Sequence, residues 1–419
     1  MQAVSTNKKN SIVLFLLWPF FSVIYALKNY KAPWAKDILW FFVVFFGFTL
    51  TIHNTGEETN DANRYKDKFV AMASHEISFS ELTASFYNAE DQTLDILESL
   101  IIFFISRFTG NVQVLFAVFG LIFGYFYSRN IWFLIDRAGR KIVPENIPVI
   151  ITFAFIVGFW QLSGFRFWCG AQIFLYGTLP YLFDGNKRSL RFSFLAVLMH
   201  FAYVLPLGVL GIFIFTGRRS KLFFGMFIVT FFLKEFSISQ ISDFLTSHLP
   251  AILQPKVKTY TNTEVIERQA EDFSKVNWYI KAYTGALKWT IVSFLIAVFL
   301  TGQKFLSRNK NFNNLLSFTL LMYSAANVAG MMPSGGRFLA IANLFAVALI
   351  FFYVQYAPRS KAIKRIIVLS VPSLALYNIV AIRVSFDIMS LFVIFGNPIL
   401  SMFINVDITI IEMVKQLIS

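Results

Sequence analysis

Apolar runs of membrane-spanning length follow one another along most of this chain, and they exclude most folds. Hydrophobic residues make up 57% of the 419 residues, and Phe alone occurs 52 times. Charged residues make up 14% of the chain, compared with about 25% in a soluble domain. A water-soluble fold lacks the polar surface to cover so much apolar side chain, whereas bilayer hydrocarbon solvates it. The sequence therefore predicts a single integral-membrane domain over residues 1–419.

Helices are the expected elements, because the alternation and regular turns of a membrane β-barrel are missing. A spanning helix needs about 17–25 mostly apolar residues. The runs that approach this length are residues 11–27, 38–53, 112–135, 147–162, 165–183, 192–215, 222–236, 286–306, 315–332, 338–356, 366–382 and 388–404. With re-entrant or broken helices included, we expect an all-α, polytopic transmembrane helix bundle of about 11–14 spans.

The basic residues fall mainly in short segments between these runs, which is the positive-inside pattern of membrane proteins. The net charge of +14 is therefore attributed to loop bias, and no nucleic-acid partner is expected. Lys28, Lys31 and Lys36 place the first loop in the cytoplasm. Residues 54–93 then form an outer polar segment with an interfacial helix, and residues 237–285 form a large outer loop.

Two segments do not fit a regular span in this scheme. Only one full crossing fits between residues 54–93 and the basic cluster at 137–141, so residues 94–108 are expected to be a re-entrant or interfacial helix. Residues 192–215 lie between two basic clusters that both belong inside, so we expect a broken hairpin that turns near residues 200–206.

Ionisable groups at membrane depth are costly, so those near the outer face are functional candidates. The alternative for each Arg is that its side chain simply reaches from a helix end toward the interface. Asp61, Arg64 and Tyr65 follow the second run, in a segment that mixes carboxylates, cations and aromatics. Arg166 opens a helix after an outer turn at Gly164, where a guanidinium suits a bidentate contact with phosphate.

Four further candidates lie in other outer segments. His200 lies at the expected hairpin break, although a lone His on an apolar helix is usually a structural hydrogen-bonding residue. Arg337 follows two glycines and opens another helix, and Arg383 forms a similar outer-face pair with Asp387. A carboxylate in an apolar setting can act as an acid or a base, which makes Glu98 a candidate in the short run 94–108.

Neither a metal nor another cofactor is expected. The four histidines form no His-x-x-x-His pair, and the outer loops contain no Asp-x-Asp pair. The chain has no Gly-x-x-x-x-Gly-Lys motif, so the sequence does not support ATP-driven work. Cys169 is the only cysteine, which excludes an intramolecular disulfide and a thiolate metal cluster.

The candidate residues occur in a definite order along the chain. An Asp-x-x-x-Tyr-x-x-x-Phe pattern, here Asp61, Tyr65 and Phe69, follows the second run. After it come the short run with Glu98, the helix-opening Arg166, an Ala-x-x-x-His-Phe motif that contains His200, and the helix-opening Arg337. This order, over residues 60–337, resembles the EpsG-like branch of the Wzy oligosaccharide repeat-unit polymerases. The chain departs from the family pattern at Thr59 and Asn60, which replace the usual Gly before the Asp.

The resemblance implies a GT-C-like glycosyltransferase of the bacterial cytoplasmic membrane, metal-independent and with its active site facing outward. Its partners would be the bilayer and undecaprenyl-pyrophosphate-linked oligosaccharide repeat units, and a chain-length regulator is left open as a further partner. The units are joined into an O-antigen, capsule or exopolysaccharide as an acceptor hydroxyl attacks the donor's anomeric carbon and lipid pyrophosphate leaves. The implied catalytic candidates are Asp61, Glu98 and His200, and the implied substrate-binding candidates are Arg64, Tyr65, Arg166, Arg337 and Arg383.

Three other functions use similar groups, and the sequence leaves them open. A flippase or transporter for lipid-linked glycan also needs a cationic cavity, but it predicts polar groups along the full depth of the bundle. A membrane acyltransferase that modifies a glycan would depend on His200 alone. A non-catalytic assembly subunit would tolerate loss of the arginines. The sugars, their linkage and the stereochemistry are also left open.

Overall fold

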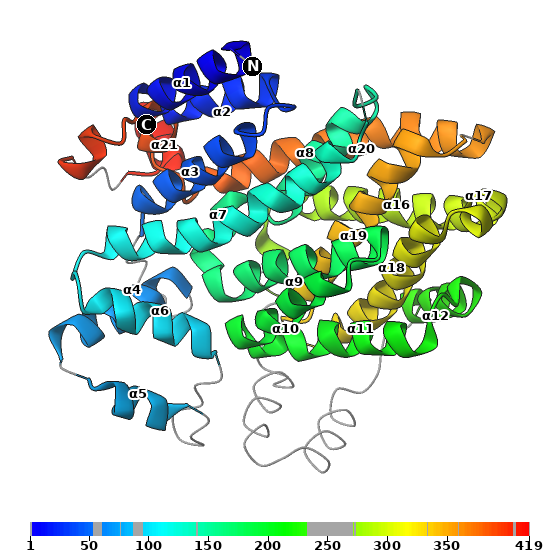
Figure 1. Ribbon diagram of the computed structural model, residues 1–419, viewed down its shortest axis with the longest axis horizontal. Coiled ribbons are helices and arrows are strands. Elements are labelled where there is room, and N and C mark those ends of the chain that lie inside the picture. Colours follow the sequence, from blue (N-terminus) through cyan, green and yellow to red (C-terminus); the bar gives the residue numbers. More distant parts are fainter. Residues whose placement is uncertain are drawn as a thin grey trace.

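Helices form nearly all of the structure (Figure 1). The computed structural model describes residues 2–52, 61–75, 77–86, 95–139, 141–232, 271, 274–332, 334–358, 360–404 and 408–418. In these ranges the α-helices are α1 (Gln2–Leu17), α2 (Pro19–Lys28), α3 (Ala35–Phe48), α4 (Asp61–Ser74), α5 (Phe79–Ser85), α6 (Ile96–Ser106), α7 (Val112–Asp136), α8 (Asn146–Ile156), α9 (Phe165–Asp184), α10 (Leu190–Met199), α11 (Val204–Thr216), α12 (Ser220–Phe232), α16 (Trp278–Thr301), α17 (Gln303–Arg308), α18 (Lys310–Ala329), α19 (Arg337–Tyr356), α20 (Lys361–Ser385), α21 (Phe392–Phe395) and α22 (Ile410–Ile418). The short 3₁₀ helices are η1 (Phe159–Gly164), η2 (Lys187–Ser189), η3 (Phe201–Tyr203) and η5 (Leu400–Met402). The all-α prediction is confirmed for the described residues, which include no β-strand; an isolated bridge joins Ser390 and Thr409.

Five stretches of the described chain are long and apolar enough to cross a membrane. They are Val112–Asp136, Asn146–Asp184, Trp278–Thr301, Arg337–Tyr356 and Lys361–Ser385. Among the shorter apolar helices, α12 packs against α18, and α6 packs against α4 and α10. These lengths and compositions are those of a helical membrane protein. The expected count of about 11–14 spans is not reached by such stretches, because several apolar runs are divided into short helices.

Glycines bring α3 and α7 into close backbone contact. A Cβ added at Gly47 would lie 2.1 Å from the carbonyl oxygen of Phe116, and one added at Gly120 would lie 2.5 Å from that of Val43. These pairs show that the two helices run antiparallel. Small residues allow membrane helices to approach closely, where van der Waals packing drives their association. The α3–α7 pair forms the support on which α4 and η1 rest.

Helix α9 lies in the middle of the fold, against α7, α10 and α18 (Figure 1). Thr178 and Ser193 share a hydrogen bond of 2.9 Å between their hydroxyls, and the Tyr203 hydroxyl donates to the carbonyl of Phe167 at 2.8 Å. The two contacts show that α10 and η3 run antiparallel to α9. They also bring the start of η3 to the N-terminal end of α9, where Arg166 lies.

Several apolar runs are not single helices. The run 11–27, expected as one span, is divided at Trp18 into α1 and α2, and Ser22 donates back to the carbonyl of Ser11 at 2.9 Å. Pro19, the first residue of α2, has no backbone N–H with which to continue α1. The break predicted in the run 192–215 is present, because His200 has extended backbone between α10 and η3. The hairpin predicted with it is not shown by the packing, since α10 lies mainly against α9 and α11 against α18.

The prediction of a span at residues 388–404 is wrong. The structure there has only α21 and η5, joined through Gly396 and Asn397. The residue after Asn397 is Pro398, which removes a donor and disfavours helical backbone before it. The Asn397 side chain instead accepts from the backbone N–H of Ile399 at 2.8 Å, as in a turn.

The segments expected at the outer face are partly described. Helix α6 confirms a short helix within the run 94–108: its 11 residues extend over about 16 Å, roughly half of the hydrocarbon thickness. Residues 54–93 contain α4 and α5, and the rest of that segment lies outside the described residues. Of residues 237–285, the structure describes 271 and 274–285, and α16 already begins at Trp278.

We predict that Gly47→Ala lowers the free energy of unfolding by about 1–3 kcal/mol, because the added methyl group collides with the backbone of α7. Thermal unfolding of the detergent-solubilised protein measures the change. Gly208→Ala is the matched control, since a Cβ there meets no atom within 4 Å and Ala favours the helix. Equal stability of the two variants would contradict this account of the α3–α7 contact.

Candidate functional site

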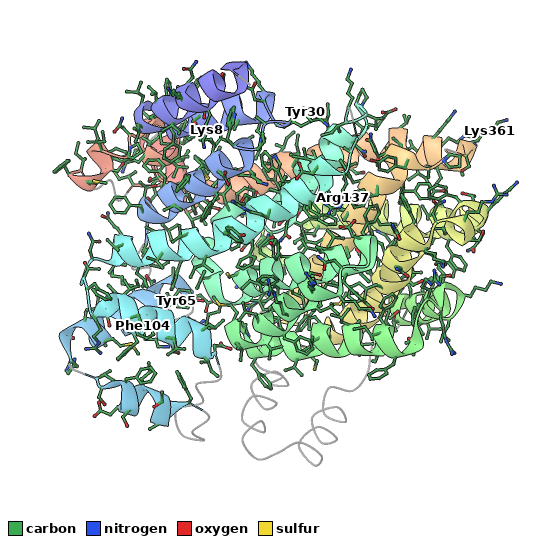
Figure 2. All side chains as sticks on the ribbon, in the orientation of Figure 1. Lys8, Tyr30, Tyr65, Phe104, Arg137 and Lys361 are labelled. Carbon is green, nitrogen blue, oxygen red and sulfur yellow. The ribbon has the colours of Figure 1, made fainter. Side chains whose placement is uncertain are left out.

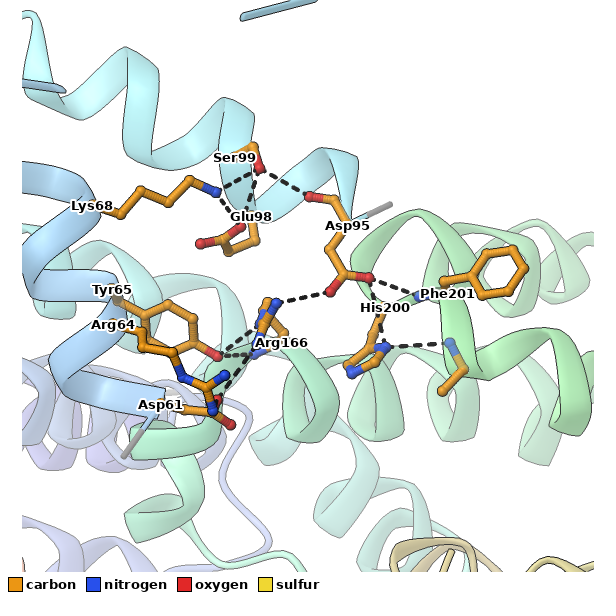
Figure 3. Close-up of polar contacts among 11 residues, drawn as sticks. Asp61, Arg64, Tyr65, Lys68, Asp95, Glu98, Ser99, Arg166, His200 and Phe201 are labelled. Atoms are coloured by element: carbon orange, nitrogen blue, oxygen red, sulfur yellow. Dashed lines mark hydrogen bonds and ion pairs between the residues drawn. The ribbon is translucent and has the colours of Figure 1, made fainter. Parts of the chain in front are cut away.

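Polar side chains from four parts of the chain meet at the N-terminal end of α9 (Figure 3). Helix α4 contributes Asp61, Arg64, Tyr65 and Lys68, and the N-terminal end of α6 contributes Asp95, Glu98 and Ser99. Arg166 lies at the second position of α9, and His200 lies at the break after α10. Residues distant in sequence thus form one cluster, which we call the Arg166 cluster.

The Arg166 guanidinium is held by two carboxylates and a phenol. Its Nη1 lies 3.1 Å from Oδ2 of Asp95, and its Nη2 lies 3.4 Å from Oδ1 of Asp61. The Tyr65 hydroxyl accepts from the Arg166 Nε at 3.3 Å and from its backbone N–H at 3.2 Å. The Arg166 side chain keeps 27% of its surface exposed, so the cluster is open to a ligand at one side.

Aromatic packing supports the arrangement of Tyr65 and Arg166. Tyr65 is buried and meets the ring of Phe119 edge-on, with 5.5 Å between the ring centroids. Phe119 stacks in turn on Phe165, the residue before Arg166, at 3.8 Å. Burial raises the pKa of Tyr65 above its usual value, so the hydroxyl keeps its proton near neutral pH. The packing of Tyr65 and Phe165 on Phe119 therefore helps to position Tyr65 and Arg166.

Asp61 also joins the cluster to the exposed edge of α4. Its Oδ1 accepts from Arg64 Nη2 at 2.6 Å, in addition to its contact with Arg166. The Arg64 side chain is 56% exposed, whereas the Asp61 side chain is 20% exposed. The fold thus brings Asp61, Arg64 and Tyr65, which are separate candidates in the sequence, next to Arg166.

Within the cluster, His200 lies outside the five candidate spans. Its Nδ1 accepts from the backbone N–H of Ala202 at 3.2 Å and lies 3.6 Å from Oδ1 of Asp95. Burial lowers the pKa of His200 to about 4, against an opposing contribution from Asp95. The ring is then neutral near pH 7, and because Nδ1 accepts, the proton is carried by Nε2. In this tautomer the ring offers a hydrogen-bond donor, not a base.

Arg337 approaches the same place from α19. Its guanidinium carbon lies 5.6 Å from the centre of the Phe167 ring, and His200 meets that ring edge-on at 5.5 Å. Phe167 follows Arg166 directly, so Arg166, His200 and Arg337 gather around two consecutive residues of α9. Arg337 is exposed, and in the described part of the chain no carboxylate lies within ion-pair distance of it.

The turn before Arg337 depends on a glycine. A Cβ at Gly335 would lie 1.7 Å from the carbonyl oxygen of Ala329, so no other residue fits without moving the backbone. Ser334, beside it, has a positive φ of 61°, a conformation that L-residues rarely adopt. The two consecutive glycines noted in the sequence thus include one that the turn requires.

Glu98 is buried, and it is paired in a way that its sequence position did not reveal. Its Oε2 lies 2.9 Å from Nζ of Lys68, which also donates to the Ser99 hydroxyl at 2.7 Å. The Glu98 side chain is 3% exposed, so Lys68 compensates a buried carboxylate. Neither Lys68 nor Asp95 is among the residues for which the sequence predicts a role. The spacing Asp61–Tyr65–Lys68, one face of a single helix, was the signal available for Lys68.

Arg383 is the candidate that no described contact joins to the cluster. It lies near the end of α20 and pairs with Asp387 at 2.6 Å, as the sequence predicted for that pair. Both side chains are partly exposed. The structure therefore separates Arg383 from the other candidates, because α20 packs on α8 and α16 and not on α9.

A surface cleft of about 550 Å³ lies between α4 and α5, lined by Met72, His75, Ile77, Glu81, Leu82 and Ser85. Met72 follows Tyr65 by two turns of α4, about 10 Å along the helix. The cleft thus opens on the helix that carries Asp61 and Lys68. Among the described residues, no three His, Cys, Asp or Glu side chains are grouped to hold a metal ion.

Comparison of the chain with models of protein families, with curated proteins and with solved structures finds no match in any of the three. The residues of the cluster are therefore the basis for proposing a function.

We predict that Lys68→Ala lowers the free energy of unfolding by about 2–3 kcal/mol, because the Glu98 carboxylate is left buried without a cation. Because part of the Lys68 side chain is exposed to solvent, the expected loss of stability is at the low end for a buried ion pair. Thermal unfolding in detergent measures it. Lys66→Ala, on the same helix, should have little effect, and Glu98→Gln in the Lys68→Ala background should restore part of the loss. A double variant no more stable than Lys68→Ala would refute the pairing.

Proposed function

We propose that this chain is an integral-membrane glycosyltransferase that polymerises oligosaccharide repeat units linked to undecaprenyl pyrophosphate. The observation that supports it is the gathering of Arg166, His200 and Arg337 around the start of α9, beside the carboxylates of Asp61 and Asp95. These are the groups that the resemblance to EpsG-like and Wzy polymerases implies, together with one carboxylate, Asp95, that it does not.

The reaction needs cations for a leaving pyrophosphate, and the two arginines differ in what they offer. Arg337 is exposed and has no carboxylate partner in the described chain, so its guanidinium is available for bidentate contact with phosphate oxygens. Arg166 is already engaged by Asp61 and Asp95. We assign Arg337 as the main pyrophosphate contact and Arg166 as a second, whose carboxylate partners hold it in place.

The acceptor hydroxyl needs a group that takes its proton as it attacks the anomeric carbon, while the bond from that carbon to the pyrophosphate oxygen breaks. Asp61 is the assigned base, since its carboxylate is the more exposed of the two beside Arg166. His200 in its neutral form donates from Nε2, which suits a hydrogen bond to a phosphate or sugar oxygen. Glu98, held by Lys68, is assigned a structural role.

The placement of the cluster agrees with an outward-facing site. Arg137 and Lys361 belong to segments that the positive-inside pattern puts in the cytoplasm. In Figure 2 these two residues lie toward the upper right, and Tyr65 and Phe104 lie toward the lower left. The cleft between α4 and α5 lies on the same side as Tyr65 and gives room for sugar residues of a bound glycan.

We predict that Arg337→Ala, expressed in cells that lack the native copy, lowers polymerisation about 100-fold or more, because the leaving pyrophosphate loses a charge-assisted contact. Gel analysis of surface glycan then shows single or few repeat units. Arg337→Lys keeps the charge but not the bidentate fork, so its chain lengths should be intermediate. Arg383→Ala is the control, since Arg383 is a partly exposed arginine that no described contact joins to the cluster, and it should leave long chains.

Long chains from Arg337→Ala and Arg166→Ala alike would refute the proposal. The same gels separate the alternatives. Loss of a flippase removes surface glycan altogether, whereas loss of a polymerase leaves single units at the surface. Loss of an acyltransferase leaves chain length unchanged and alters only the acyl content of the glycan.

A further inference from the structure

Asp95 occupies the N-cap position of α6 but does not cap that helix. An Asp at this position ordinarily accepts a hydrogen bond from a backbone N–H in the first turn of its own helix. Other N-caps of this chain do so: Ser78 accepts from Glu81 at the start of α5, and Asn111 accepts from Gln113 at the start of α7. The Asp95 carboxylate is therefore directed to other partners.

Those partners lie on two other elements (Figure 3). Asp95 Oδ2 accepts from Nη1 of Arg166 at 3.1 Å, and Oδ1 accepts from the backbone N–H of Phe201 at 2.9 Å. The same Oδ1 lies 3.6 Å from Nδ1 of His200. The Asp95 side chain is 13% exposed, so these contacts form largely away from solvent. One carboxylate thus joins α6 to the start of α9 and to the break between α10 and η3.

The position of the Asp95 carboxylate requires two hydrogen-bond acceptors, one toward each neighbouring donor. Each oxygen of Asp95 faces a donor, Arg166 on one side and the N–H of Phe201 on the other. An Asn has the same size and shape, but its NH₂ group must face one of these donors in either orientation. A Glu offers two acceptors and differs by one methylene. Asp95→Asn is therefore predicted to disrupt the two contacts more than Asp95→Glu does, although Asn matches Asp in size.

We propose that Asp95 is a positioning residue, which holds the Arg166 guanidinium and the His200 backbone break in the arrangement that the reaction uses. The contacts of Asp95 stand by themselves, whereas their effect on polymerisation rests on the proposed function. Without the Asp95 carboxylate, the Phe201 N–H loses its acceptor and Arg166 keeps only Asp61 as a charged partner. His200, whose backbone precedes Phe201, then loses the contact that fixes the break.

The geometric part is tested on the purified full-length protein by hydrogen–deuterium exchange of the backbone amides at residues 201–203. Asp95→Ser is the variant of choice, because Ser caps a helix well but is too short to reach both donors. Exchange at Phe201 is expected to rise about tenfold, as the amide loses a charge-assisted hydrogen bond. Asp387→Ser, which removes the partner of Arg383, is the matched control and should leave these amides unchanged. Unchanged exchange in Asp95→Ser overturns the proposal.

The functional part compares Asp95→Asn with Asp95→Glu by surface-glycan chain length. Positioning by two acceptors predicts shorter chains for Asn than for Glu, with partial rescue in the Glu variant. A space-filling role predicts the reverse order, and a capping role predicts normal chains for Asp95→Ser; either result overturns the proposal. Long chains from all variants of Asp95, Arg166 and Arg337 would overturn the proposed function while leaving the exchange result to decide the geometry of Asp95.

Discussion

The hydrogen bonds and ion pairs of Arg166 are the interaction on which the rest of this site depends. A guanidinium that is largely out of water needs compensating groups, and here they come from α4 and from the N-terminal end of α6. Neither α4 nor α6 is long enough to cross a membrane, so both rely on contacts with the bundle for their position. The Arg166 cluster supplies polar contacts, and the packing of Tyr65 and Phe165 against Phe119 supplies apolar ones.

Irregular backbone is concentrated around this cluster. The chain leaves regular helix at η1 before Arg166, at His200 after α10, and at the Ser334–Gly335 turn before Arg337. Helix breaks at membrane depth expose backbone groups that must find partners, and protein interiors or polar cavities are where this is tolerated. At His200 the partners are visible: the Phe201 N–H donates to Asp95, and the Ala202 N–H donates to the His200 ring. The break at His200 gives the site backbone N–H donors. Arg166, His200 and Arg337 each lie at or next to one of the three breaks.

The two polar subsites of the cluster have different characters. Around Arg166, the carboxylates of Asp61 and Asp95 are partly exposed, and each is held by more than one contact. Around Glu98, Lys68 and Ser99 satisfy a carboxylate that is almost fully buried. A carboxylate already neutralised in the interior stabilises packing, whereas groups at a solvent-open edge can exchange their partners for a ligand. This difference is why Asp61 and not Glu98 is assigned the proton-accepting role.

The sequence by itself determined the membrane class and the helical content, because the length and composition of apolar runs are local properties. It also indicated the break at His200 through the basic residues on both sides of one apolar run. It did not indicate the division of the run 11–27 at Trp18, and it failed at residues 388–404, where local turn chemistry at Asn397 and Pro398 prevailed over apolar composition. Only the tertiary structure decided that Lys68 pairs with Glu98, that Asp95 joins Arg166 to Phe201, and that Arg383 lies apart. Those contacts link residues far apart in the chain, and their partners depend on which helix faces pack together, which no local pattern specifies.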